Sequence, residues 1–65
     1  MAREISELTL PHGDANYTFD LIVEDGMVTA SHPDFGSKTT QVGGSPWHVI
    51  GAQLARELIR ENLKQ

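Results

Sequence analysis

The segment that decides the fold is residues 17–32, YTFDLIVEDGMVTASH. Its first half alternates apolar and polar side chains, which is the period of a strand with one buried face. Asp25 and Gly26 then form the pair that a two-residue type I′ turn prefers, because both central positions of that turn need positive φ. The segment therefore predicts a β-hairpin, whose first strand buries Tyr17, Phe19, Leu21 and Val23.

The register of this hairpin follows from its turn. Counting outward from Asp25 and Gly26 gives three opposed pairs, which are Val23 with Val28, Leu21 with Ala30, and Phe19 with His32. All six side chains then lie on one face of the hairpin. The turn and the hydrophobic pattern therefore agree on a single register.

Weaker signals flank the hairpin. Residues 5–10 predict an edge strand, and residues 11–16, PHGDAN, predict a loop by their composition. After residues 33–37, PDFGS, the β-branched segment 38–42, KTTQV, has little to bury. It is either a fourth strand at an edge or a loop, and the sequence leaves this choice open.

The last third of the chain predicts one helix. Ser45 is a good N-cap, and Pro46 suits the first helical position, where its missing N–H costs nothing. At about 100° per residue, the apolar side chains share one arc, as in a helix that lies on a sheet. They are Trp47, Ile50, Gly51, Leu54, Ala55, Leu58 and Ile59. The predicted fold is α+β, with a three- or four-stranded antiparallel meander and one C-terminal amphipathic helix on one face, forming one domain over residues 1–65.

Length and composition limit the function classes. A chain of 65 residues buries only about 60% of its unfolded surface, so self-association, as a homodimer, is the expected source of further stability. No cysteine is present, which excludes disulfides and thiolate zinc sites. The net charge of −4 disfavours nucleic acid and anionic lipid. Without a long apolar run or an apolar signal core, we expect a cytoplasmic protein with no membrane contact.

One helix cannot cover both faces of a sheet, so the second face is free for water or a partner. It is predicted to carry Thr18, Asp20, Ile22 and Glu24 beside Met27, Thr29 and Ser31. Its apolar members are Ile22 and Met27, and its acidic, threonine-rich character suits a basic protein surface better than nucleic acid. Trp47 is expected to close the open end of the core, although tryptophan is also common at binding hot spots. The predicted partner-binding residues are therefore Ile22, Met27, Thr18, Thr29 and Trp47.

Basic residues follow one side of the predicted helix. Arg56, Arg60 and Lys64 recur every four residues, which stacks like charges. A solvated face is the first interpretation. A stripe that follows phosphates, extended by Lys38, is the alternative.

The turn before the helix, residues 43–48, GGSPWH, has two interpretations as well. Free N–H groups at a helix N-terminus attract anions, so Gly43, Gly44, Ser45 and His48 are candidates for an anion or metabolite site. Pro46 removes one donor, and no P-loop lysine is present. A sharp turn capped by Ser45 is therefore the preferred interpretation.

Catalysis and metal binding have little support in the sequence. His32 and His48 approach each other only if the helix begins over the end of the hairpin, where Asp34 or Asp14 would complete a metal or proton-relay set. The spacing matches no metal-ligand motif, and no serine lies in a nucleophile elbow. We expect no enzyme, no metal and no cofactor, with His32 as a polar edge of the core beside Phe19.

A meander followed by a helix resembles, in architecture alone, the arm-binding domain of some integrases and the latter part of double-stranded-RNA-binding domains. The lysine cluster that precedes the last helix of the RNA-binding domains is absent, since residues 36–46 hold only Lys38. Architecture alone does not imply function. The sequence favours a small non-enzymatic protein-interaction module, as in accessory or inhibitor proteins of bacteria and their mobile elements, self-associating through the free sheet face or an edge strand. Nucleic-acid binding and anion binding are the two alternatives.

Overall fold

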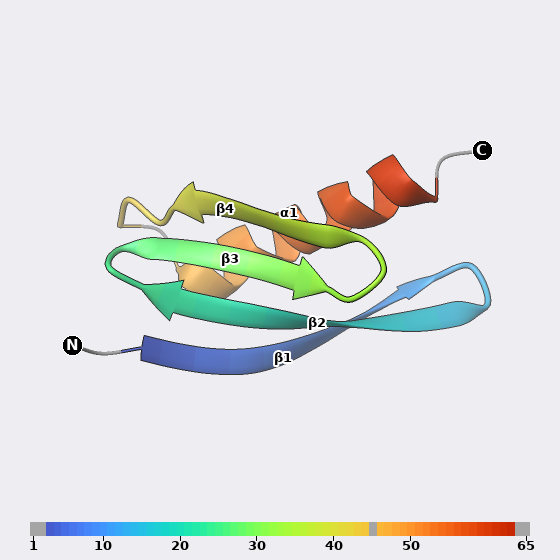
Figure 1. Ribbon diagram of the computed structural model, residues 1–65, viewed down its shortest axis with the longest axis horizontal. Coiled ribbons are helices and arrows are strands. Elements are labelled where there is room, and N and C mark those ends of the chain that lie inside the picture. Colours follow the sequence, from blue (N-terminus) through green and yellow to red (C-terminus); the bar gives the residue numbers. More distant parts are fainter. Residues whose placement is uncertain (1–2, 45, 64–65) are drawn as a thin grey trace.

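The computed structural model describes residues 3–44 and 46–63. Its elements are β1 (Arg3–His12), β2 (Ala15–Glu24), β3 (Met27–His32), β4 (Gly36–Gln41) and α1 (Trp47–Asn62). The strands form one antiparallel sheet in the order β1-β2-β3-β4, and α1 lies diagonally across one face (Figure 1). The predicted α+β meander with a C-terminal helix is therefore confirmed, and of the two alternatives left open the four-stranded sheet is correct.

The central hairpin has the predicted register over most of its length. Val23 is opposite Val28 and Leu21 is opposite Ala30. Asp25 and Gly26 have φ of 55° and 74°, as a type I′ turn requires. The β2–β3 ladder ends at Asp20 and Ser31, so the third expected pair lies one position beyond it in the same register. The rings of Phe19 and His32 nevertheless contact each other, with centroids 5.2 Å apart.

The loop predicted at residues 11–16 is mostly strand. β1 continues to His12 and β2 begins at Ala15, so that only Gly13 and Asp14 form the turn. Pro11 pairs with Asn16 inside the ladder. Because β1 is an edge strand, a proline can be accommodated there, which a composition rule does not foresee.

The helix begins one residue later than expected. Pro46 occupies the N-cap rather than the first helical position, because its ψ of 126° is extended. The carbonyl of Pro46 accepts from the N–H groups of Val49 and Ile50. Among the described residues no side chain caps the helix, and Ser45, the predicted cap, lies outside them.

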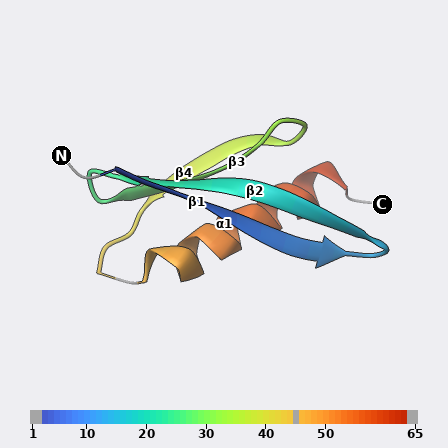
Figure 2. The same ribbon diagram turned by 90° about the horizontal axis from the view of Figure 1, so that it is seen from below.

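The core lies between α1 and the sheet face that it covers (Figure 2). Within the described part of the chain every buried side chain is apolar, and Phe19, Val28, Ala30 and Ala55 have no exposed surface. The predicted apolar arc of the helix is confirmed, with Gly51, Leu54, Ala55, Leu58 and Ile59 buried and Trp47 and Ile50 partly buried against the core. Leu21 approaches α1 so closely that a Cβ on Gly51 would lie 2.9 Å from its Cδ1.

Candidate interaction surfaces

The face of the sheet that α1 leaves uncovered carries an apolar patch. Ile5 and Ile22 are directly opposite each other on β1 and β2. Met27 lies beside them, opposite Glu24 on the neighbouring row. Ile5 is 61% exposed and Met27 is 39% exposed, which is high for large apolar side chains. The free-face patch, defined as Ile5, Ile22 and Met27, extends the predicted pair Ile22 and Met27 by one residue that the sequence pattern did not single out.

Polar side chains surround the free-face patch. Two threonine pairs span neighbouring strands, with Oγ1 atoms 2.9 Å apart between Thr9 and Thr18 and 2.7 Å apart between Thr29 and Thr39. Both predicted threonines of the face therefore already have a hydroxyl partner. They form a hydrogen-bonded rim, in which one hydroxyl of each pair donates to the other.

Acidic groups dominate the charge of this face. Glu7 and Asp20 are directly opposite each other, an arrangement that costs stability because the charges repel. Arg3 pairs with Glu24 at 3.8 Å between Nε and Oε1, and both side chains are about half exposed. Among the described residues this face thus carries the carboxylates of Glu7, Asp20 and Glu24 and the guanidinium of Arg3, which agrees with the predicted acidic character.

Neither edge of the sheet is well suited to pairing with an added strand. Pro11 in β1 has no N–H to offer a neighbouring strand. β4 has only six residues, and Lys38 in its middle reaches toward α1 rather than away from the sheet. Short edges, prolines and inward-pointing charges all discourage pairing with another chain. Of the two interaction surfaces that the sequence suggested, the face is therefore favoured over the edge.

Trp47 is separated from the other predicted partner-binding residues. It begins α1, on the opposite side of the sheet, and is partly buried against the core. Its ring contacts the exposed His48 edge-on, with centroids 4.7 Å apart. This placement agrees with the expectation that Trp47 closes one end of the core.

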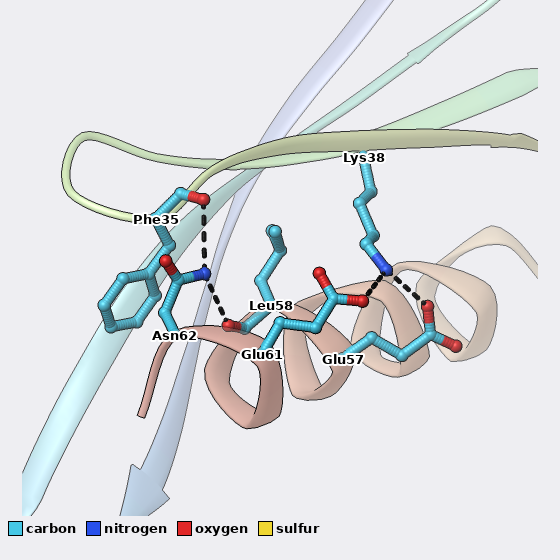
Figure 3. Close-up of polar contacts among 6 residues, drawn as sticks. All are labelled: Phe35, Lys38, Glu57, Leu58, Glu61 and Asn62. Carbon is cyan, nitrogen blue, oxygen red and sulfur yellow. Dashed lines mark hydrogen bonds and ion pairs between the residues drawn. The ribbon is translucent and has the colours of Figure 1, made fainter. Parts of the chain in front are cut away.

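Lys38, one of the predicted nucleic-acid contacts, lies on β4 beside two carboxylates of α1. It faces α1 and donates to Glu61 and, at 3.3 Å, to Glu57 (Figure 3). The hydrogen bond to Glu61 raises the pKa of Lys38, and the bond to Glu57 adds to this effect. The ammonium is thus neutralised by two carboxylates. Lys38 therefore links β4 to the helix.

Arg56 and Arg60 lie on the other side of α1, next to β1. Together with Ile59 and Leu63 of the helix end, they line a cavity of about 450 Å³. The wall toward β1 consists of Leu10, Pro11 and His12. Neither arginine forms an ion pair with any residue in 3–44 or 46–63, and Lys64, the third predicted cation, lies outside that part of the chain. Sequence reasoning missed the cavity, because nothing local to either segment indicates that the end of β1 lies beside the end of α1.

The turn before the helix has the predicted sharp geometry. Gly43 and Gly44 both have positive φ, of 64° and 98°. They bring the chain from Val42, whose N–H donates to the carbonyl of Gly26, to the start of α1. Pro46 at the N-cap has no N–H, and His48 is exposed, so the anion site at this turn stays a prediction.

The histidines do not converge. His32 stacks on Phe35 with ring centroids 4.3 Å apart, and its Nδ1 accepts from the N–H of Asp34. Phe35 lies near the end of α1, where its carbonyl accepts from Asn62 (Figure 3). His48 lies in the first turn of that helix, which is about 24 Å long over its 16 residues, so the condition under which His32 and His48 would approach each other is not met. Among the described residues no three potential ligands are close enough to hold a metal ion.

The chain matches no protein-family model, no curated protein sequence and no solved structure. Within residues 3–44 and 46–63, no helix has both the length and the apolar character needed to span a membrane. The functional proposal therefore rests on the geometry and charge of the surfaces described above.

Proposed function

We propose that this protein is a small non-enzymatic protein-binding module that self-associates through its uncovered sheet face. The observation that carries the proposal is the free-face patch, in which the exposed Ile5 lies directly opposite the partly buried Ile22 and the exposed Met27 lies beside them. Contiguous exposed apolar side chains mark interaction sites, whereas isolated ones need no explanation. A second copy that packs face to face would remove this patch from water.

The charge of the face distinguishes a second copy from another partner. Two copies bring like-charged carboxylates together, among them Glu7 and Asp20 of each face. Added salt screens this repulsion, so self-association should strengthen as ionic strength rises. Binding to a basic partner surface would weaken under the same conditions.

The first experiment is light scattering at two protein concentrations about a hundredfold apart, at low and high salt. We expect a dimer that is favoured by concentration and by salt. Ile5→Lys should convert the dimer to a monomer, because it places a charge in the patch. Ser37→Lys, an exposed position on β4 of the same face and away from Ile5, is the matched control and should leave the dimer intact. A wild-type monomer under all conditions would rule out self-association.

Nucleic-acid binding has less support. Of its four proposed contacts, Lys38 is neutralised by Glu57 and Glu61. Of the other contacts, the structure describes Arg56 and Arg60. Two arginines are far fewer than the roughly 6–10 phosphate contacts of a salt-sensitive DNA-binding protein. The charge of −4 opposes it further. Binding to duplex DNA that falls steeply with salt and is lost in an Arg56→Ala, Arg60→Ala variant would restore this alternative.

A further inference from the structure

The cavity between β1 and α1 has an apolar floor and a cationic rim. Its floor consists of Leu10 and Ile59, which are 8% and 4% exposed, together with the partly buried Leu63. Arg56, Arg60 and His12 surround the floor with exposed polar ends. At about 450 Å³, the cavity falls within the roughly 300–1,000 Å³ range of small-molecule sites.

The position of the helix explains why the cavity is open. α1 packs mainly against β3, and Lys38 connects its Glu57 and Glu61 side to β4. Figure 2 shows α1 crossing β1, after which the two diverge toward the turn that joins β1 and β2. The side of the helix that carries Arg56 and Arg60 therefore faces the end of β1 without a further element to cover it.

The charges on α1 are separated by side. The carboxylates of Glu57 and Glu61 already have Lys38 as a counter-ion. Arg56 and Arg60 are one helical turn apart and have no carboxylate partner in the described part of the chain. Two neighbouring guanidinium groups repel each other, and a carboxylate between them would relieve that repulsion.

We propose that this cavity binds a single-chain carboxylate, an anionic amphiphile of the fatty-acid type. Its carboxylate pairs with Arg56 and Arg60, since guanidinium groups match carboxylate geometry with two parallel hydrogen bonds. Its alkyl chain packs on Leu10, Ile59 and Leu63. A peptide strand is a poorer occupant, because Pro11 in the wall lacks the N–H that strand addition would use at this point.

The test is a titration of the ¹⁵N-labelled protein with octanoate, kept below its micelle-forming concentration and followed by amide chemical shifts. We expect saturable shifts confined to Leu10, His12 and residues 56–63. The double variant Arg56→Gln, Arg60→Gln should weaken binding by about tenfold or more, since it removes charged hydrogen bonds. Arg3→Gln removes a guanidinium far from the cavity and should bind octanoate as the wild type does. The Ile5→Lys variant should also bind normally, which separates this site from the proposed dimer face.

Chain length tests the apolar floor. Each CH₂ from hexanoate to decanoate should tighten binding by about two- to fourfold, the upper value corresponding to full burial. Leu63→Asn should reduce this gain while leaving the amide spectrum of a folded protein. The proposal is overturned if octanoate causes no localised shifts, if octanol binds as tightly as octanoate, or if the arginine variant binds unchanged. Binding of an acidic peptide without any binding of octanoate would overturn it as well.

Discussion

Substituting Gly26 tests whether the central turn requires positive φ, because an added side chain at this position would make almost no packing contacts. Its φ is 74°, and a Cβ added to it would meet no atom within 4 Å. Gly26→Ala should therefore lower the free energy of unfolding by about 1–2 kcal/mol, the cost of holding a side chain in the left-handed region. Urea unfolding measures this loss.

Asp25 is the matched control for this prediction. It also has positive φ, and asparagine adopts that conformation at least as readily. Asp25→Asn should change the stability by less than about 0.5 kcal/mol. Equal stability of the Gly26→Ala variant and the wild type would mean that the turn is not type I′ in solution.

Gly51 is required for a different reason, the close approach of β2 to α1. Alanine is the better helix former by about 1 kcal/mol. Its Cβ would, however, lie within 3.0 Å of both terminal methyl carbons of Leu21, which is only 2% exposed and has little room to move. Overpacking costs about 1–3 kcal/mol, so Gly51→Ala should destabilise the protein by about 1 kcal/mol net.

A double-mutant cycle separates packing from helix propensity. Leu21→Val shortens the side chain that the new Cβ would meet, so Gly51→Ala should cost less in that background than in the wild type. Gln53→Gly, on the exposed side of α1, measures the effect of glycine on helix stability without a change in core packing. A Gly51→Ala variant that is as stable as the wild type, or more so, would show that the helix can shift away from β2.

Lys38 acts between two elements. Its ammonium joins β4 to Glu57 and Glu61 of α1, and its pKa is raised above the ordinary 10.5, first by the hydrogen bond to Glu61. A group whose pKa is higher in the folded than in the unfolded state stabilises the fold fully below the unfolded value. That contribution is lost as pH rises through the folded value.

We therefore expect Lys38→Met to be less stable than the wild type at neutral pH, and this difference to vanish at strongly alkaline pH. Urea unfolding of both proteins at each pH measures it. Lys38→Arg is the control, because a guanidinium stays charged over this pH range. The arginine variant should therefore remain more stable than the methionine variant at every pH. A wild-type advantage that is independent of pH would mean that the stem of Lys38, rather than its charge, stabilises the junction.

The elements that the sequence predicted are those whose signals are local. The hairpin turn depends on Asp25 and Gly26 themselves, and the buried arc of α1 follows from its own periodicity. The loop prediction at Pro11 failed because it relied on composition, although an edge strand, which was predicted for residues 5–10, can accommodate a proline. Ile22 and Met27 were predicted for the free face from the alternation of one hairpin. Ile5 joins them only through the pairing of β1 with β2.

The cavity and the ion pairs of Lys38 depend on how the helix crosses the sheet. Arg56 and Arg60 were predicted for the polar side of the helix, and they are exposed as expected. Their proximity to Leu10 at the end of β1 is a contact between residues more than forty positions apart. Lys38 reaches Glu61 over 23 positions. No periodicity within either segment encodes such contacts.

At the scale of the whole molecule, one helix covers one face of a four-stranded sheet and leaves the other open. The nine buried apolar residues of the described chain form a small core, and a domain of this size draws only about 3–5 kcal/mol from it. Both sheet edges are protected against strand addition, at Pro11 and through Lys38. Further stabilisation by association is therefore expected at the free-face patch.

If the protein unfolds from a dimer, its stability depends on its concentration. Mass action should then raise the free energy of unfolding by about 1.4 kcal/mol for each tenfold increase in protein concentration. The measurement is the urea midpoint at several concentrations in high salt, which screens Glu7 and Asp20. Ile5→Lys should remove the dependence, whereas Ser37→Lys should retain it. If the wild-type midpoint is the same at every concentration, the folded unit is a monomer and the free-face patch serves a different protein, whose surface should be basic to complement the carboxylates around it.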